Sequence, residues 1–530
     1  MYYIIIVILT FFQSLLMNWM MGLPVFDASP YTLRLWCNYI AAAMILWSPM
    51  LLTNKRRWTY AFAILLNVWF IGNLIYFRSY GDVLNRWCLQ NASNMDGIWN
   101  SIIPFLRWGD LFFPCITILW IIISETIRIN FFFSLWKRIC LAFIAFLLFC
   151  APQTLIHKKA ELPISPFNSY YADLSMGRIW YVHTFGAITH FANEVINLVV
   201  HREEKVTPVR EKEITDYIQV PDSIPEQGNL MLIIVESLED WTIGLDVNGQ
   251  EVTPNINRLV DDPKTGHYPM IAQVKEGKSS DARLIAFNGL LPICNGAASM
   301  RYAANTYPSL VKYSYSCTKQ MYASSRGHSW NFEMNSNSYG FDSLYADIAS
   351  DGIMANIVNH TIAKSPTPFI ISICTMASHS PFLEFADSSS LDITNSNYDE
   401  TKTRYLRCVH YTDSAIGCVI NTILTDATLA NNTRIVITGD HPIFDLITPV
   451  PFIIYDPFMS PVAVSRPLYQ IDIYTTLVER MHIATPWRGL GKNIADSCAY
   501  TKEEMKALET LSDRLIRTNY FSDGFVVCAH

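Results

Sequence analysis

The sequence lacks the patterns that mark several large classes of protein. None of its 12 cysteines is arranged with the C-x-x-C spacing of a zinc knuckle or a redox motif. No repeat, collagen-like or low-complexity segment is present, and no basic stripe accompanies the net charge of −7, which argues against nucleic acid as a partner. Charged residues make up only 16% and hydrophobic residues 51% of the chain, a balance typical of membrane proteins.

The charge is unevenly divided between the two parts of the chain. Residues 1–156 carry 10 Lys+Arg and 5 Asp+Glu, whereas residues 157–530 carry 29 and 41. The sequence therefore predicts an apolar, slightly basic transmembrane domain over residues 1–156, followed by an acidic, polar part that is long enough for its own core.

Five apolar stretches in the first part each approach the roughly 20 residues that cross a hydrocarbon core. They cover residues 2–24, 33–52, 58–77, 108–126 and 137–156. The first has neither a basic flank nor an A-x-A-like cleavage site, so we expect a retained anchor. Basic residues follow the second and fourth stretches, which predicts that these loops are cytoplasmic and that the polar part lies outside. If one stretch were instead a buried core helix, the predicted side would invert.

Short apolar runs alternate with helical patterns in the polar part. We expect a helical, membrane-proximal linker over 157–228, a catalytic domain over 229–495 and a C-terminal tail over 496–530. Buried strands are predicted at 229–235, 368–374, 434–438 and 450–455, and helices near 253–262, 281–291, 405–424 and 467–481. Strands separated by helices indicate an α/β sandwich with a mainly parallel sheet.

Ionisable residues follow three of the predicted strands. Glu236 comes directly after the first strand, His379 follows the second, and Asp440 and His441 follow the third. Each has an ordinary explanation by itself: a surface glutamate, a hydrogen-bonded core histidine or a helix N-cap. Because the carboxyl ends of parallel strands meet at one edge, where ligands bind, we expect them to converge.

A divalent cation would account for that convergence. The oxygen and nitrogen ligands of Glu236, Asp440 and His441 suit Zn²⁺ or Mn²⁺, with Mg²⁺ as a further possibility. Ser279 precedes a predicted helix and could supply the fourth ligand as a hydroxyl activated for nucleophilic attack. An ordinary serine N-cap is the alternative for Ser279.

Seven ordered blocks between residues 229 and 455 resemble the lipoteichoic acid synthase family of the alkaline phosphatase superfamily, which also contains sulfatases and phosphoethanolamine transferases. The blocks are Asn229–Leu238, Gly249–Leu259, Gly277-Lys-Ser-Ser-Asp-Ala282, Ser329-Trp-Asn331 with Tyr339–Asp342, Ser378-His-Ser-Pro381, Val409–Gly417 and Gly439-Asp-His441. The five apolar stretches fit the same family.

The resemblance implies a role for each matching residue. Glu236, Asp440 and His441 match metal ligands, and Ser279 stands where the family has its nucleophile, usually threonine. His379 and Trp330 match residues that contact the phosphoryl head group. The family's Trp-Asn-Arg is here Trp330-Asn331-Phe332, so an arginine expected to hold phosphate is missing.

Two further cations complete the set of candidate substrate-binding residues. Lys278 directly precedes Ser279, and Arg283 follows it by four residues, the spacing found in the sulfatase signature. For Lys278, a solvated lysine is the alternative interpretation.

We therefore expect a metal-dependent phosphotransferase of the bacterial cytoplasmic membrane. It would move a phosphoglycerol or phosphoethanolamine head group from a phospholipid donor to an envelope glycan or lipid acceptor through a phosphoserine intermediate. A sulfatase or phosphatase of the same superfamily is the first alternative, and a membrane sensor without catalysis is the second.

Overall fold

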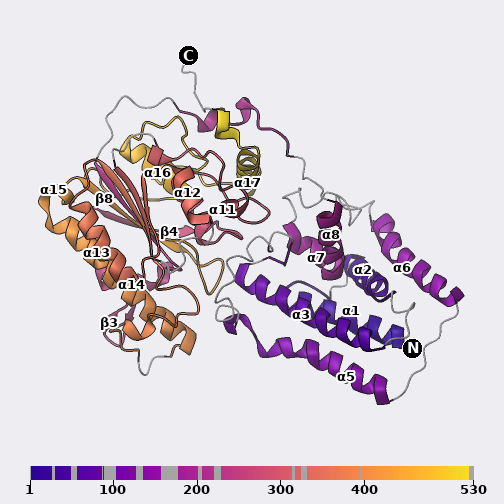
Figure 1. Ribbon diagram of the computed structural model, residues 1–530. Helices are drawn as coiled ribbons and strands as arrows, with labels where there is room; N and C mark the ends of the chain where they lie inside the picture. Colours follow the sequence, from indigo (N-terminus) through magenta and orange to yellow (C-terminus); the bar gives the residue numbers. More distant parts are fainter. Residues whose placement is uncertain are drawn as a thin grey trace. The chain divides into compact units, whose positions relative to one another are not determined.

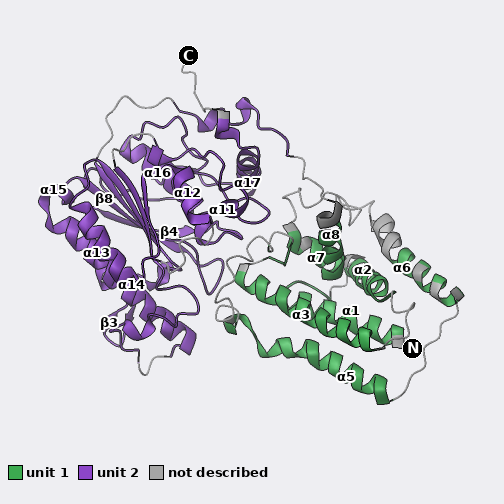
Figure 2. Ribbon diagram, in the orientation of Figure 1, with its two compact units in different colours: residues 1–90, 97–205 green, residues 91–96, 206–530 purple. Residues whose placement is uncertain are grey.

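The computed structural model divides the chain into two compact units (Figure 2): residues 1–90 with 97–205, and residues 91–96 with 206–530. The structure describes residues 2–26, 30–48, 56–80, 82–85, 88, 103–126, 135–156, 177–200, 206–219, 228–312, 317–323, 331–393 and 397–523. The unit boundary at residue 205 falls within the predicted linker; the predicted domain limits themselves stay predictions.

The first unit is helical. Its longer helices are α1 (Tyr2–Met20), α2 (Pro30–Trp47), α3 (Arg56–Tyr80), α5 (Phe112–Thr126) and α6 (Leu135–Ile156). By length and composition, three helical segments among the described residues could cross a membrane: Tyr3–Met20, Arg57–Ser79 and Trp108–Thr126. These correspond to three of the five predicted spans. The described parts of the other two predicted spans are helical as well, in α2 and α6; residues 49–52 lie outside the described residues, and the count of five stays a prediction.

Polar side chains inside the first unit bond to one another. The Gln13 amide on α1 donates to Asn67 Oδ1 on α3 at 2.9 Å and to Thr117 Oγ1 on α5 at 3.3 Å. The Thr117 hydroxyl also donates to Asn67 Oδ1, at 3.1 Å. Because an unbonded polar group is costly in an apolar environment, this network fixes the three helices against each other.

The predicted helical part of the linker forms α7 (Gly177–Phe185) and α8 (Ala187–Val200), which pack within the first unit. The Asn38 amide on α2 donates to the Thr184 carbonyl at 2.8 Å, and the Tyr39 hydroxyl donates to the His183 carbonyl at 2.9 Å. Residues 177–200 are thus anchored to the apolar helices.

The second unit contains an eight-stranded sheet in the order β10-β4-β9-β8-β1-β7-β5-β6 (Figure 1). Its strands are β1 (Asn229–Val235), β4 (Thr265–Ile271), β5 (Cys317–Tyr322), β6 (Ser343–Tyr345), β7 (Phe369–Cys374), β8 (Thr433–Gly439), β9 (Val450–Tyr455) and β10 (Leu468–Tyr469). Among the described strands of this sheet, only the pairings of β9 with β4 and with β8 are antiparallel. The predicted mainly parallel sheet is therefore confirmed.

The central strand β1 shows why the sheet lies between helices. Leu230 and Leu232 belong to the hydrophobic cluster on one face, whereas Met231 and Ile233 belong to the cluster on the other, and all four are fully buried. A strand with both faces buried needs an uninterrupted apolar sequence, as β1 has. Figure 1 shows α13 (Asp351–Ile362) and α14 (Glu400–Thr425) on one face and α12 (Phe332–Tyr339) and α16 (Asp472–Met481) on the other.

Sequence patterns located the inner strands better than the outer ones. All four predicted strands exist as β1, β7, β8 and β9, and the predicted helices correspond to α9 (Pro254–Val260), α10 (Ser279–Asn288), α14 and α16. The outer strands β4, β5, β6 and β10 were not predicted, because they are short or carry polar residues.

The part of the predicted C-terminal tail that the structure describes packs on the second unit. Helix α17 (Lys502–Arg517) begins with a capping box, in which the Thr501 hydroxyl accepts from the Glu504 N–H at 3.0 Å. Its buried residues Leu508, Leu511 and Leu515 join the hydrophobic cluster on one face of the sheet.

Candidate active site

Glu236 is the first residue after β1, and its backbone is held by the segment that follows the neighbouring strand β7. Its N–H donates to Thr375 Oγ1 at 3.0 Å, and its carbonyl accepts from the Ser378 hydroxyl at 2.5 Å. The Ser237 hydroxyl donates to Glu236 Oε1 at 2.9 Å. The Glu236 side chain is only 3% exposed, so its carboxylate is buried and fixed at the carboxyl edge of the sheet.

Asp440 and His441 follow β8, the neighbour of β1 on the other side. Asp440 Oδ1 accepts from the N–H groups of Ser237 and His441, both at 2.7 Å. The Gln470 amide donates to the Asp440 carbonyl at 2.7 Å. Backbone and side chain of Asp440 are therefore both anchored, and its carboxylate links the ends of the two strands.

The glycine before Asp440 allows this close approach. Gly439 is the last residue of β8, and a Cβ atom there would lie 2.1 Å from the Leu238 carbonyl oxygen. Any larger residue would push the end of β8 away from the segment that follows β1.

The side chains of Glu236, Asp440 and His441 surround one point. One ligand atom from each lies within 4.8 Å of the others, and all three residues are buried. His441 Nε2 is 3.6 Å from both Glu236 Oε1 and Asp440 Oδ2, too far for ordinary hydrogen bonds. His441 Nδ1 lies 3.1 Å from the Pro442 carbonyl. A proton on Nδ1 leaves the Nε2 lone pair directed toward the carboxylates, as a metal ligand requires.

The electrostatics of this group also fit a cation. Burial raises the pKa of Glu236 to about 8, and the negative charge of Asp440 adds to the rise. Two buried carboxylates facing the same point are unfavourable unless a positive charge compensates them. Two oxygen donors and one imidazole nitrogen form a set that Zn²⁺ and Mn²⁺ accept.

Ser279 reaches this group from the start of α10. Its hydroxyl donates to Glu236 Oε2 at 3.1 Å, across 43 positions of sequence. The residue is half-buried, so its oxygen borders both the carboxylate and the outside of the site. The structure therefore brings together the four predicted metal-site residues, Glu236, Ser279, Asp440 and His441.

The loop before Ser279 is held by a carboxylate that the sequence analysis gave no role. Asp281 Oδ2 accepts from the N–H groups of Lys275 and Gly277, at 2.9 and 3.0 Å. A Cβ atom on Gly277 would lie 2.2 Å from Asp281 Oδ1, so only glycine fits between loop and carboxylate. Asp281 thus closes the turn that presents Ser279.

Lys278 lies in a conformation that is unusual for a residue with a side chain. Its φ is +46° and its ψ is −120°, in a region that glycine favours. Burial lowers the pKa of Lys278 to about 8, while the nearby carboxylates of Asp440 and Glu236 oppose the shift. The Lys278 side chain is therefore within electrostatic range of the carboxylates of Glu236 and Asp440.

Arg283 lies one helical turn after Ser279 and is buried, with 4% of its surface exposed. Its guanidinium carbon is 3.8 Å from the centre of the Phe332 ring and 6.0 Å from that of Tyr322. Arg283 Nη1 has no hydrogen-bond acceptor among the described residues. The arginine is held by ring stacking and keeps donor capacity for a ligand.

The other two predicted substrate-binding residues are His379 and Trp330. His379 is exposed in the loop after β7, and its Nδ1 lies 2.6 Å from the Ser380 carbonyl. It follows Ser378, which bonds to the Glu236 backbone, so it belongs to the same edge of the sheet. Trp330 lies outside the described residues.

Several supporting residues could not be predicted from local sequence. Thr375 and Ser378, in the segment after β7, and Gln470, just before α16, hold the backbone of the site. Each is an ordinary polar residue in the sequence. The position of Asp281 two residues after Ser279, in the first turn of a helix, is the one local signal that was available.

Two family matches cover most of the chain. Residues 1–192 match the lipoteichoic acid synthase N-terminal domain, and residues 228–483 match the sulfatase family. A lipoteichoic acid synthase of Staphylococcus aureus (strain USA300) is 25% identical over 430 residues, which cover 76% of this chain. The chain spans 66% of the length of that relative, slightly under two thirds.

Solved structures similar to this chain include two proteins of related description. One is the lipoteichoic acid synthase LtaP from Listeria monocytogenes, at 17% identity and a TM-score of 0.49, covering 59% of this chain and 98% of that one. The other is the phosphoglycerol transferase GacH from Streptococcus pyogenes in complex with sn-glycerol-1-phosphate, at 15% identity and a TM-score of 0.43, covering 59% and 94%.

The mainly parallel sheet of the second unit and the match over residues 228–483 indicate a domain of the sulfatase type. The chain thus pairs a match to the lipoteichoic acid synthase N-terminal domain with a match to the sulfatase family, and it is similar to curated lipoteichoic acid synthases.

Proposed function

We propose that this chain is a membrane-anchored, metal-dependent phosphotransferase with Ser279 as its nucleophile. The observation that carries the proposal is the hydrogen bond from Ser279 to Glu236 at 3.1 Å, beside a group of three potential metal ligands. The relatives named as lipoteichoic acid synthases support transfer rather than another use of the fold.

The reaction proceeds in two half-reactions. In the first, Ser279 Oγ forms a bond to the phosphorus of a phospholipid head group, and the bond from phosphorus to the diacylglycerol oxygen breaks. Ser279 loses its hydroxyl proton, and the departing diacylglycerol oxygen gains one. In the second, an acceptor hydroxyl on an envelope glycan or lipid attacks the phosphoserine, loses its proton and returns the serine hydroxyl.

Each candidate residue has a part in this reaction. Glu236, Asp440 and His441 would hold one Zn²⁺ or Mn²⁺ ion together with Ser279. When bound, that ion supplies Lewis-acid stabilisation of the charge on the phosphoryl group. Asp281 fixes the loop so that the Ser279 oxygen borders the acidic group.

The substrate would be held by a second set of residues. Lys278 and Arg283 supply positive charge to the phosphoryl oxygens. His379 and Trp330 are proposed to contact the head group.

We further propose that the chain spans the bacterial cytoplasmic membrane several times, with the catalytic domain outside. The three apolar helices support membrane insertion, and a lipid donor would explain why the catalytic domain is attached to it. Basic residues at 55–57 favour a cytoplasmic loop there. A reporter fused after His530 that is active only outside the cell membrane supports this topology; activity in the cytoplasm would refute it.

The decisive experiment incubates the solubilised full chain with phosphatidylglycerol or phosphatidylethanolamine labelled in the head group. Diacylglycerol release and transfer of label to the protein should both disappear in Ser279→Ala. The matched control is Ser414→Ala, because Ser414 is exposed on α14 and bonds only to the His410 carbonyl of its own helix. Release that continues in Ser279→Ala would refute the nucleophile.

The sulfatase match favours one alternative, a hydrolase of the same superfamily. The two functions predict different chemistry at residue 279. Mass spectrometry of the peptide that carries Ser279 should find serine or phosphoserine for the transferase. Formylglycine at that position would indicate a sulfatase instead.

A further inference from the structure

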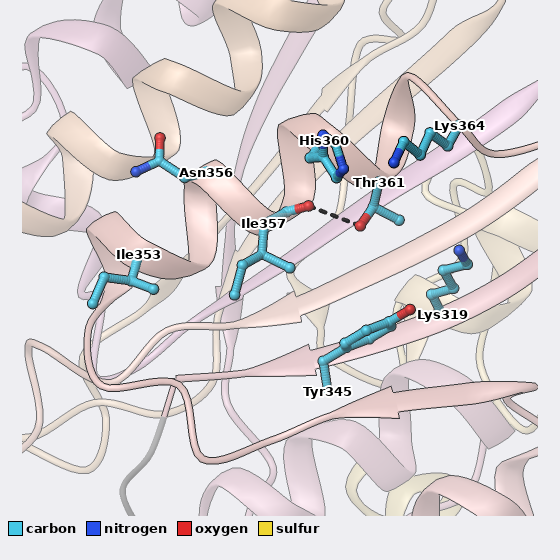
Figure 3. Close-up of a pocket in the computed structure, with 8 residues that line it drawn as sticks. All are labelled: Lys319, Tyr345, Ile353, Asn356, Ile357, His360, Thr361 and Lys364. Carbon is cyan, nitrogen blue, oxygen red and sulfur yellow. Dashed lines mark hydrogen bonds between the residues drawn. The ribbon is translucent and has the colours of Figure 1, made fainter.

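A pocket with a volume of about 540 Å³ lies at the outer edge of the sheet in the second unit (Figure 3). This volume falls within the roughly 300–1,000 Å³ that small-molecule sites usually occupy. Its walls come from three parts of the chain. Lys319 lies on β5 and Tyr345 on β6, and the other lining residues belong to α13 except for Lys364, which follows that helix.

This pocket is separate from the site at Glu236. Strand β6 is the last strand of the sheet, and β5 and β7 stand between it and β1. Lys319 lies in the middle of β5, paired with Ile371 in the middle of β7, whereas Glu236, Asp440 and His441 follow the carboxyl ends of β1 and β8. A ligand in the pocket would therefore occupy a second location on the domain.

The polar side of the pocket is basic. Lys319, His360 and Lys364 all line it, and no acidic side chain does. Within the described part of the chain, none of these three side chains makes a hydrogen bond or ion pair. In Figure 3, Lys319, Lys364 and the Tyr345 hydroxyl lie toward the same end of the pocket. Positive groups without acidic partners at a concave surface attract an anion.

The end of α13 explains part of this charge. His360 stands in the last turn of that helix and Lys364 just after it, where positive charge stabilises the helix dipole. The helix dipole does not explain Lys319, which lies on the strand β5. Met321, two residues further along the same face of β5, is fully buried in the hydrophobic cluster. A half-buried lysine that shares the pocket with a second lysine, Lys364, is unfavourable unless something negative joins them.

The remaining lining residues include the apolar Ile353 and Ile357 and the polar Asn356 and Thr361. Ile353 and Ile357 line the end of the pocket away from Lys319, as Figure 3 shows. Lysine is a compact point charge that suits phosphate, whereas a planar carboxylate is better matched by the fork of arginine. A ligand that fills the pocket would combine a phosphate group with an apolar or alcohol portion.

We infer that the pocket between β5, β6 and α13 binds an organic phosphate ester. Its phosphate contacts Lys319, Lys364 and His360, and its organic portion lies against Ile353 and Ile357. The inference is independent of the reaction proposed at Ser279, because it concerns binding at a separate place. Both a lipid head group and a water-soluble ester have this chemistry.

Hydrogen–deuterium exchange of the solubilised full chain tests the inference directly. Butyl phosphate should slow exchange in segments 317–322, 343–345 and 351–364. The double variant Lys319→Met/Lys364→Met should weaken binding roughly tenfold or more, because it removes two charge-assisted contacts and keeps the apolar stems. Lys502→Met is the matched control, since Lys502 is exposed at the start of α17 and lines no part of the pocket.

Further probes distinguish the ligand's source and chemistry. Tighter binding of dihexanoyl phosphatidylglycerol than of glycerol phosphate assigns the pocket to a lipid, and the reverse assigns it to a soluble ester. Inorganic phosphate that binds as tightly as butyl phosphate would overturn the role of the apolar wall. Absence of protection, or equal protection in the double variant, would overturn the site itself. Should the double variant unfold, Lys364→Met alone provides the same test at an exposed position.

Discussion

The guanidinium of Arg283 lies 3.8 Å above the ring of Phe332. The family pattern leads us to expect an arginine at position 332, and here that position supplies a stacking surface for an arginine from α10. The positive charge beside position 332 is therefore supplied by α10, which carries Arg283, and not by α12, which carries Phe332. The face of a phenyl ring is negative, so it holds a guanidinium without consuming its hydrogen-bond donors.

This arrangement predicts the effect of two substitutions at Arg283. Arg283→Met should lower kcat/KM for phospholipid cleavage by about tenfold or more, because a charged donor to the substrate is lost. Arg283→Lys should recover only part of the activity, because an ammonium neither stacks flat nor presents a planar fork. Steady-state diacylglycerol release measures both. Equal activity of all three chains would show that Arg283 serves packing alone.

Metal binding should stabilise the second unit. A chelator is expected to lower the unfolding temperature of the full chain, and Zn²⁺ or Mn²⁺ should restore it, since ligand at a hundredfold excess over Kd adds about 2.7 kcal/mol. Glu236→Gln and His441→Ala should abolish the response. His410→Ala is the control, because its ring nitrogens already contact the Val252 carbonyl and Ser390. A response that survives in both site variants would place the ion elsewhere.

Replacement of Asp281 should damage the loop that presents Ser279. Asp281→Ala leaves the N–H groups of Lys275 and Gly277 without their acceptor, at about 1–3 kcal/mol for each buried group. Chemical denaturation should show the loss, and transfer activity should fall with it.

Asp399 provides a comparison for that variant. Its carboxylate also accepts a backbone hydrogen bond, from Lys402 at 2.8 Å, but it caps α14 at an exposed position. Asp399→Ala should cost about 1 kcal/mol and leave the activity unchanged. If both variants retain activity, the Asp281 loop does not position the nucleophile.

A buried ion-pair group beneath the sheet should be sensitive to the loss of one member. Asp456 lies 3.2 Å from Arg434 Nε and 2.9 Å from Arg480 Nη1, and all three side chains are almost fully buried. Asp456→Ala is expected to destabilise the fold by about 3–5 kcal/mol in denaturant titrations, because two buried guanidinium groups lose their shared carboxylate. Arg404→Met, at an exposed pair with Glu400, should cost below about 0.5 kcal/mol. Similar losses in both would contradict this account.

The contact between Glu213 and α17 should depend on pH. The Arg514 guanidinium donates to Glu213 at 2.7 Å and lowers the pKa of Glu213 from 4.5 to about 2. Because the folded-state pKa is the lower one, the contact stabilises the fold above about pH 4.5, and the contribution disappears as the pH falls toward 2. Thermal unfolding across this range should show a shallower loss in Glu213→Gln than in the unmodified chain. Glu211→Gln serves as control, and identical curves for Glu213→Gln and the unmodified chain would refute the coupling.

Local sequence was sufficient to locate the inner strands and the ionisable residues at their ends. The runs that form β1, β7, β8 and β9 are mostly apolar, because both faces of an inner strand are buried. The outer strand β5 (Cys317–Tyr322) carries a lysine and a glutamine and gave no such signal. Polar residues directly after buried strands indicated Glu236, Asp440 and His441, since parallel strands place their ends on one edge.

The sequence by itself determined an apolar helical part, a mainly parallel sheet and the residue types of the acidic group. Tertiary structure alone decided that the Ser279 hydroxyl meets Glu236, that Asp281 closes the loop before it, that Arg283 stacks on Phe332, and that Lys319 and Lys364 share a pocket. The apolar helices and the inner strands could be predicted because hydrophobic periodicity involves only residues close together in the sequence. These contacts join residues distant in sequence or depend on backbone conformations that only the packed sheet and helices impose.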